Sequence, residues 1–211
     1  TYRRVYEDGV ELQNTVVKTE TIQEAIPEIV MLGSQTPFAS LVIPGKIAYL
    51  SAGNAWVMDG TTGNRRAIVT TGDLDGQVFS LAPGGDWLLF TRTADEDNII
   101  NRLWAARLDD ETPLLLDLGV TNVIHFADWG AGLSVVGYST VEPRSTAPGW
   151  QANNDLSIIG VSPSGYVSPA RPELEANSGG VYGWWGMDFQ WANDGVRLAF
   201  SRPDSIGLYD T

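Results

Sequence analysis

The sequence predicts an all-β fold made of short antiparallel strands in repeated units. Two observations support this fold class. Apart from a turn or two near residues 21–25, no stretch keeps an apolar period of 3.6 residues, so no helix longer than about ten residues is expected. A motif of strand, glycine-containing turn and strand also recurs along the chain.

The composition excludes several classes of function. With 13 basic and 26 acidic residues the net charge is −13, which argues against nucleic acid as a partner. Cysteine is absent and His125 is the single histidine, so disulfides, thiolate metal sites and sites with two imidazoles are excluded. No run of about 18 apolar residues is present, so we expect no membrane insertion. We predict no cofactor and no metal.

The N-terminal segment predicts a β-hairpin. Two stretches rich in Val and Tyr, Tyr2–Glu7 and Val10–Val17, flank the dipeptide Asp8-Gly9, which favours a tight turn. A short helical turn is expected near residues 21–25, because Thr21 and Glu24 have the spacing of a capping box. A third short strand is expected over residues 28–33.

The run YRRVYEDGVELQNTVVKTETIQEAIPEIVMLGS, residues 2–34, resembles the C-terminal half of a G-five domain. That family ends with a strand, a D-G or N-G hairpin, a strand, a linker with proline and a closing strand. Its modules occur in bacterial cell-surface proteins and are proposed to hold N-acetylated sugars. The resemblance therefore implies a G-five-like module at residues 1–35 and an extracellular or cell-surface location in a bacterium. Because the glycine-rich first half is missing, no sugar-binding residue carries over, and a plain structural hairpin is the alternative.

The remainder of the chain repeats itself. The windows VFSLAPGGDWLLFTR (78–92) and DFQWANDGVRLAFSR (188–202) align without a gap. A looser copy, HFADWGAGLSVVGYS (125–139), needs one inserted residue, and a half copy, PGKIAYLSAGNAWVMD, begins at Pro44. We expect the two best windows to form equivalent strand pairs.

A third strand follows each copy, and a fourth follows some of them. The third strands are anchored at intervals of 48, 54 and 50 residues by Trp56, Trp104, Ile158 and Leu208. Four short strands in about 50 residues is the period of a β-propeller blade. Residues 36–211 are therefore predicted to form a partial β-propeller of three to four four-stranded antiparallel blades. Because propellers close with about four to eight blades, we expect a segment of a longer polypeptide whose remaining blades are partners.

The turns identify a second resemblance. Ala82-Pro83-Gly84-Gly85 and Ala192-Asn193-Asp194-Gly195, followed by strands such as LAFSR, are similar to the S-P-D-G turns of TolB-like propellers. The resemblance covers residues 45–210 and specifies architecture rather than function. Phe79 and Phe189 are expected to pack blade on blade. Arg92 and Arg202 are expected to pair with carboxylates of a neighbouring blade.

One aromatic cluster is the best candidate for a ligand site. Tyr182, Trp184 and Trp185 lie in the run VYGWWGMDFQW, and Trp150 lies in a long insertion at residues 140–154. Trp184 and Trp185 are adjacent, so in a strand they face opposite ways. A flat exposed ring could stack on a sugar, and burial in the core is the alternative.

Other candidates have structural explanations. The acidic clusters at residues 73–76 and 95–98 are interpreted as solvated turns, and His125 as a structural residue within an apolar strand. No catalytic residue is predicted. We therefore expect a non-catalytic binding or scaffold segment of a bacterial extracellular protein, with a protein or a cell-wall glycan as partner. The alternatives are the non-catalytic propeller of a larger hydrolase or peptidase, and an intrinsic glycosidase with a carboxylate pair.

Overall fold

The computed structural model describes residues 1–20, 39–109, 111–131, 134–179 and 186–211. These residues form 17 strands and no helix, and all the strand pairs are antiparallel, so the predicted all-β class is confirmed. The chain divides into two compact units, Thr1–Ala39 and Ser40–Thr211, which are described separately below. The helical turn expected near residues 21–25 and the strand expected at 28–33 lie outside the described residues.

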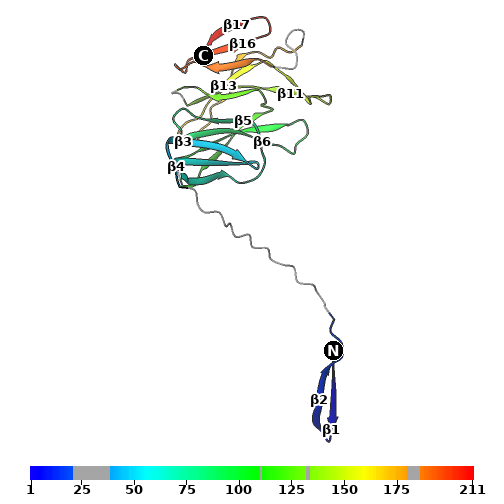
Figure 1. Ribbon diagram of the computed structural model, residues 1–211. Coiled ribbons are helices and arrows are strands. Elements are labelled where there is room, and N and C mark those ends of the chain that lie inside the picture. The colour runs from blue at the N-terminus through cyan, green and yellow to red at the C-terminus, as the bar shows by residue number, and fades with distance from the viewer. Residues whose placement is uncertain (21–38, 110, 132–133, 180–185) are drawn as a thin grey trace. The chain divides into compact units, whose positions relative to one another are not determined.

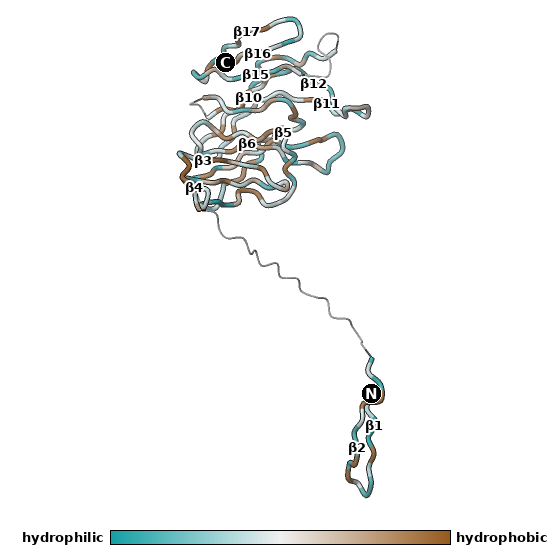
Figure 2. The backbone as a smooth tube through the Cα atoms, in the orientation of Figure 1, coloured by the Kyte–Doolittle hydropathy of each residue, from teal (hydrophilic) through white to brown (hydrophobic). Residues whose placement is uncertain are grey.

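The first unit contains the predicted hairpin. Strand β1 (Tyr2–Glu7) pairs with β2 (Val10–Val16) across a turn at Asp8 and Gly9. Both turn residues have positive φ, 49° and 80°, as the favoured two-residue hairpin turn requires. The hairpin mixes hydrophilic and hydrophobic residues along its length (Figure 2), and all of its side chains are exposed.

Apart from a small two-stranded hairpin within residues 141–152, the described part of the second unit contains four sheets, which we number in chain order. Sheet 1 consists of β3 (Val42–Ser51) and β4 (Asn54–Val69). Sheet 2 consists of β5 (Leu74–Leu81), β6 (Trp87–Thr93), β7 (Asn101–Arg107) and β8 (Leu114–Thr121). Sheet 3 consists of β9 (Phe126–Trp129), β10 (Val135–Ser139), β13 (Leu156–Gly160) and β14 (Arg171–Leu174). Sheet 4 consists of β15 (Asp188–Trp191), β16 (Arg197–Ser201) and β17 (Ile206–Asp210).

The two gapless sequence windows form the same hairpin, so their predicted equivalence is confirmed. Phe79 pairs with Phe90 in sheet 2, and Phe189 pairs with Phe200 in sheet 4. The turns also match, because the amides of Gly85 and Gly195 donate to Ala82 and Ala192 at 2.8 and 2.9 Å. These two glycines have φ of 69° and 68°, which a side chain with Cβ rarely adopts.

The predicted alignment of the third strands is wrong by one residue. Trp56 and Trp104 occupy the same position, since they pair with Tyr49 and Phe90 on equivalent second strands. Leu208 pairs instead with Ala199, the equivalent of Leu89 rather than of Phe90. A shift of one residue turns a side chain to the opposite face of its sheet. Ile158 and Leu208 therefore face away from the preceding sheet, whereas the tryptophans face toward it.

The four sheets are stacked in chain order, from β3 and β4 at one end to β17 at the other (Figure 1). Three apolar layers, one between each pair of neighbouring sheets, hold them together. The first layer joins sheets 1 and 2 through Val57, Leu88 and Phe90. The second joins sheets 2 and 3 through Leu89, Leu103, Trp129 and Val136, and the third joins sheets 3 and 4 through Phe126, Ile158, Trp191 and Leu198. Each of the two middle sheets is thus covered on both faces.

A repeated asparagine clamp links each sheet to the next. Fully buried Asn101, at the start of β7, donates to the carbonyl of Val123 and accepts from its amide, both at 2.8 Å. Val123 leads into β9 of the following sheet. Asn54 accepts from the amide of Gly72 at 2.8 Å, and Asn154 donates to the carbonyl of Asn177 at 2.7 Å. Each clamp satisfies backbone groups at the point where the chain crosses from one sheet to the next.

The pairing expected for Arg92 is corrected by the structure. Its guanidinium contacts the Asp73 carboxylate at 2.8 Å, and Asp73 directly precedes β5 of the same sheet. The ion pair therefore closes one sheet instead of joining two. For Arg202, the guanidinium lies 5.0 Å from the ring centroid of Phe200, two residues before it.

Removal of the central clamp should destabilise the second unit. Asn101→Ala leaves the buried amide and carbonyl of Val123 without their partner, so we expect the free energy of unfolding to fall by roughly 2–4 kcal/mol. Urea unfolding followed by tryptophan fluorescence measures this loss. Asn64→Ala is the control, because exposed Asn64 makes only a surface hydrogen bond to the Asp59 carbonyl at 3.1 Å. Equal losses in the two variants would contradict the clamp.

A second matched pair tests the contact between sheets 3 and 4. Both Gly85→Ala and Gly195→Ala introduce Cβ at positive φ, which costs about 1 kcal/mol. At Gly85 the new Cβ meets only the Lys46 side chain at 3.7 Å, whereas at Gly195 it collides with the backbone of Ala131. We expect Gly195→Ala to lower the melting temperature clearly more than Gly85→Ala. The reverse order would argue against the described packing of sheet 4.

Candidate functional site

The first strands of sheets 2, 3 and 4 lie side by side and border a hollow. Strand β9 contacts β5 on one side and β15 on the other. A hollow of about 350 Å³, which we call the inner hollow, opens along these strands. Its lining combines amide, hydroxyl, carboxylate and imidazole groups with aromatic rings: Gln77, Phe79, Ser80, His125, Phe126, Asp128, Phe189 and Gln190.

A row of polar side chains crosses the inner hollow. Ser80, Asp128 and Gln190 occupy the same position in the three repeats, one residue before Leu81, Trp129 and Trp191. The Ser80 hydroxyl donates to the Asp128 carboxylate at 2.5 Å across the junction of sheets 2 and 3. The backbone amide of Trp129 donates to the same oxygen at 2.8 Å. A carboxylate has two oxygens that can each accept more than one hydrogen bond, so Asp128 can accept a further hydrogen bond from a ligand.

The charge of the hollow limits what it can bind. Neither lysine nor arginine is among its described lining residues, whereas Asp128 supplies a carboxylate. An anionic ligand would meet this negative charge with no compensating cation. The chemistry therefore suits a neutral or cationic ligand that has hydroxyl or amide groups and an apolar face.

His125 lies at one end of the inner hollow, in the loop before β9 and not inside a strand as the sequence pattern suggested. Burial lowers the pKa of its imidazole, and the Asp188 carboxylate opposes part of that shift. Gly186 is pressed against the ring, since a Cβ there would lie 2.7 Å from the His125 Cδ2. The Nε2 atom is buried and has no hydrogen-bond partner among the residues that the structure describes.

Trp150 is the candidate ligand residue that the structure places at this site. Its ring meets His125 edge-on, with centroids 4.5 Å apart. The segment expected to be a long loop, residues 140–154, contains a small hairpin of β11 (Val141–Pro143) and β12 (Trp150–Ala152). This pairing fixes Trp150 in a half-buried position. Tyr182, Trp184 and Trp185 lie outside the described residues, so Trp150 is the one predicted ligand residue whose position the structure describes.

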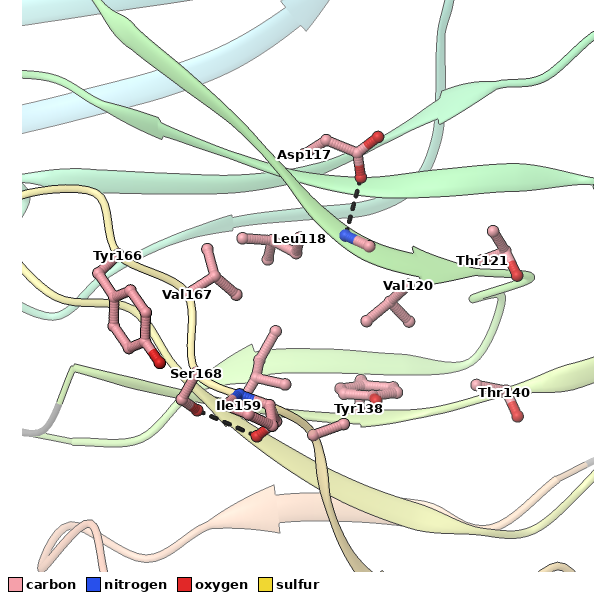
Figure 3. Close-up of a pocket in the computed structure, with 13 residues that line it drawn as sticks. Asp117, Leu118, Val120, Thr121, Tyr138, Thr140, Ile159, Tyr166, Val167 and Ser168 are labelled. Carbon is pink, nitrogen blue, oxygen red and sulfur yellow. Dashed lines mark hydrogen bonds between the residues drawn. The ribbon is translucent and has the colours of Figure 1, made fainter.

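A larger groove of about 650 Å³ separates β8 from β10, β13 and the segment 166–170 (Figure 3). Its walls include Leu118, Val120, Ile159 and Val167, and the Tyr166 ring stands at its edge. Its polar groups already serve the fold. Asp117 accepts from the amide of Gly119 at 2.8 Å, and Ser168 accepts from the amide of Gly160 at 2.8 Å. The groove therefore offers a ligand less free hydrogen-bonding capacity than the inner hollow.

The acidic turns also serve the fold. Asp75 accepts hydrogen bonds from Thr91 and from the side chain of Asn101, so it supports the central clamp and is not a solvated turn residue as expected. Glu96 pairs with Arg102 at 2.8 Å. Within the described ranges, no group of three or more His, Cys, Asp or Glu side chains could hold a metal ion.

The sequence interpretation missed Ser80, Asp128 and Gln190, because it treated the repeat windows as purely structural. A signal for them was present. The residue before Leu81, Trp129 and Trp191 is polar in all three copies, although its neighbours in the strand are mostly apolar. A polar position that recurs on the same strand of successive repeats is brought together by the stacking of those strands.

Comparisons with known proteins show no family. No family model matches the sequence, and no curated protein matches it. Among solved structures, Kuenenia stuttgartiensis hydrazine synthase is similar at 15% sequence identity, with a TM-score of 0.37. The match covers 76% of this chain and 48% of that chain, so it spans about half of the hydrazine synthase chain. In the described part of the sequence, no helix is long and apolar enough to span a membrane.

The single histidine makes the burial at this site measurable. We expect NMR titration of the His125 imidazole to give a pKa below its ordinary value of about 6.5. Because the unfolded chain then binds a proton that the folded chain does not, stability contributed by neutral His125 is complete above about pH 6.5 and is lost as the pH falls toward the folded pKa. His125→Gln should remove this component from the stability profile. An imidazole pKa above 6.5 would contradict the described burial.

Proposed function

We propose that this chain is a non-catalytic binding segment of a bacterial extracellular protein, built from TolB-like β-propeller blades after a G-five-like hairpin module. Three features support the propeller arrangement. Sheets 1 to 4 pack face to face in chain order, the first hairpins of sheets 2, 3 and 4 share one register, and the first strands of these three sheets lie side by side. In a propeller the first strands of successive blades line the central channel, where the inner hollow lies in this arrangement.

The polar row of Ser80, Asp128 and Gln190 is the observation that carries the binding proposal. These side chains border one hollow that Phe126 and Phe189 also line, with His125 at its end. A sugar presents hydroxyl groups at its edge and an apolar face, which match this lining. We therefore infer that the ligand is a neutral, N-acetylated glycan unit, such as those of bacterial cell walls.

The same lining supports binding rather than glycoside hydrolysis. Glycosidases of the common mechanisms use two carboxyl groups that flank the scissile bond. The described lining residues of the inner hollow include one carboxylate, that of Asp128. A binding propeller of this kind also fits the second sequence hypothesis, in which the catalytic domain of a hydrolase or peptidase lies elsewhere in a longer protein.

Calorimetric titration with soluble oligomers of N-acetylglucosamine tests the proposal. We expect saturable binding, accompanied by a change in tryptophan fluorescence, because Trp150 contacts His125 at the hollow. Asp128→Asn and Gln190→Ala should each weaken affinity about five- to tenfold, the effect of one lost hydrogen bond. Trp150→Ala should reduce the fluorescence response.

The control is Asp86→Asn, which removes an exposed carboxylate in the turn between β5 and β6 and should leave affinity unchanged. A thermal melt of each variant separates lost affinity from lost folding. If no oligomer binds at millimolar concentration, or if the control weakens binding as much as Asp128→Asn does, the proposed glycan site is wrong.

A further inference from the structure

Among the described residues, sheets 1 and 4 each have one face that no other sheet covers. On β17 the side chains of Ile206 and Leu208 are 84% and 63% exposed, whereas the adjacent Tyr209 packs with the residues of the third apolar layer. Ile206 and Leu208 are neighbours on this open face and form a small apolar patch in contact with water, bordered by Ser201 and Asp210. Such a surface indicates a contact that the four sheets do not satisfy among themselves.

The repeat shows what normally covers this face. Leu208 pairs with Ala199 as Ala105 pairs with Leu89, and Ile206 pairs with Ser201 as Leu103 pairs with Thr91. In sheet 2 those equivalents, Leu89, Leu103 and Ala105, are 0% exposed because they pack against sheet 3. Ile206 and Leu208 of β17 therefore occupy positions that pack against a following sheet in sheet 2, whereas exposed Arg197 occupies the position of buried Trp87.

Sheet 1 presents the complementary half of the same junction. Its Ala48 and Val57 pack toward sheet 2, so the alternate residues Ile47, Tyr49, Trp56 and Met58 face the other way. Tyr49 and Trp56 occupy the positions of Phe90 and Trp104, which in sheet 2 face the preceding sheet. Ile47 is 44% exposed, and a hollow of about 400 Å³ opens beside Tyr49, Trp56 and Arg65.

We propose that a second copy of this chain covers both faces, with sheet 4 of each copy packed on sheet 1 of the other. The two surfaces are the two halves of a junction that each chain already builds three times. Both surfaces also carry charged side chains, and Asp210 is paired in register with Arg197 of β16. Asp210 shares the exposed side of β17 with Leu208, and Arg65 lines the hollow on sheet 1.

The symmetry of this contact predicts a closed assembly. Because the contact joins two different surfaces, two copies form two identical junctions and complete a ring of about eight sheets, within the known range of propellers. The inference rests on the proposed propeller arrangement but is independent of which ligand the inner hollow binds.

Sedimentation velocity of the full chain over micromolar concentrations tests the proposal. We expect a species of twice the chain mass of 22.9 kDa. Leu208→Asp should raise the dimer dissociation constant by about 100-fold or more, because it places a charge in the centre of both junctions. Leu115→Asp is the matched control, since Leu115 is 38% exposed on β8 and lies outside the proposed contact. It should change the dissociation constant by less than about threefold.

Circular dichroism melts of both variants confirm that each chain folds, which the high exposure of Leu208 favours. A chain that stays monomeric up to about 100 µM overturns the proposal and assigns the two faces to other occupants, such as further sheets of a longer polypeptide. Open assemblies larger than two copies also overturn it, since they contradict ring closure. If the chain is monomeric but still binds the N-acetylglucosamine oligomers, the proposed dimer is wrong and the proposed function is unaffected.

Discussion

The coverage of both faces of the two middle sheets is the constraint on which the second unit depends. Strands such as β6, with Trp87, Leu88, Leu89 and Phe90 all buried, have no polar face to offer to water. A sheet made of them is stable only between two others. Sheet 2 meets this requirement through the layer it shares with sheet 1 and the layer it shares with sheet 3. Stacking in chain order follows, because each sheet is one repeat of the sequence and its neighbours in space are its neighbours in the chain.

This stacking in turn creates both the clamps and the inner hollow. Where the chain crosses from one sheet to the next, the asparagines at positions 54, 101 and 154 bond to backbone groups of the crossing segment, and at Val123 these groups are fully buried. The same register that aligns the clamps brings Ser80, Asp128 and Gln190 to one hollow, although they are 48 and 62 residues apart in the chain. A small module with a repeated polar position can thus acquire a polar site without a dedicated loop.

The repeat could be predicted from the sequence because the glycine turn and its flanking strands are local features. Gly85 and Gly195 adopt the positive φ that the windows implied, and the register of both hairpins follows from the turn. The third strands were less predictable, since a connection of variable length precedes them and a slip of one residue moved Ile158 and Leu208 to the other face. The contacts of Asn101 with Val123 and of Ser80 with Asp128 could not be predicted from the sequence, because they join residues of different repeats whose approach depends on the stacking. The hydrogen bonds of Asp75 join it to β6 and β7 of its own sheet, at positions distant in the sequence. The contact of Trp150 with His125 depends on the β11–β12 hairpin, which the loop-like composition of residues 140–154 did not indicate.

Amide hydrogen exchange at Val123 tests the central claim, that each sheet is held by apolar coverage and a clamp to the next. Val123 lies outside any strand, and its amide donates to the Asn101 side chain at the crossing between sheets 2 and 3. If the clamp and the stacking hold, this amide should exchange as slowly as those of the β6–β7 ladder, at the rate set by global unfolding of the second unit. Exchange at Val123 as fast as in exposed loops, with slow exchange in the β6–β7 ladder, would contradict the account, because the sheets would then fold without being locked to one another.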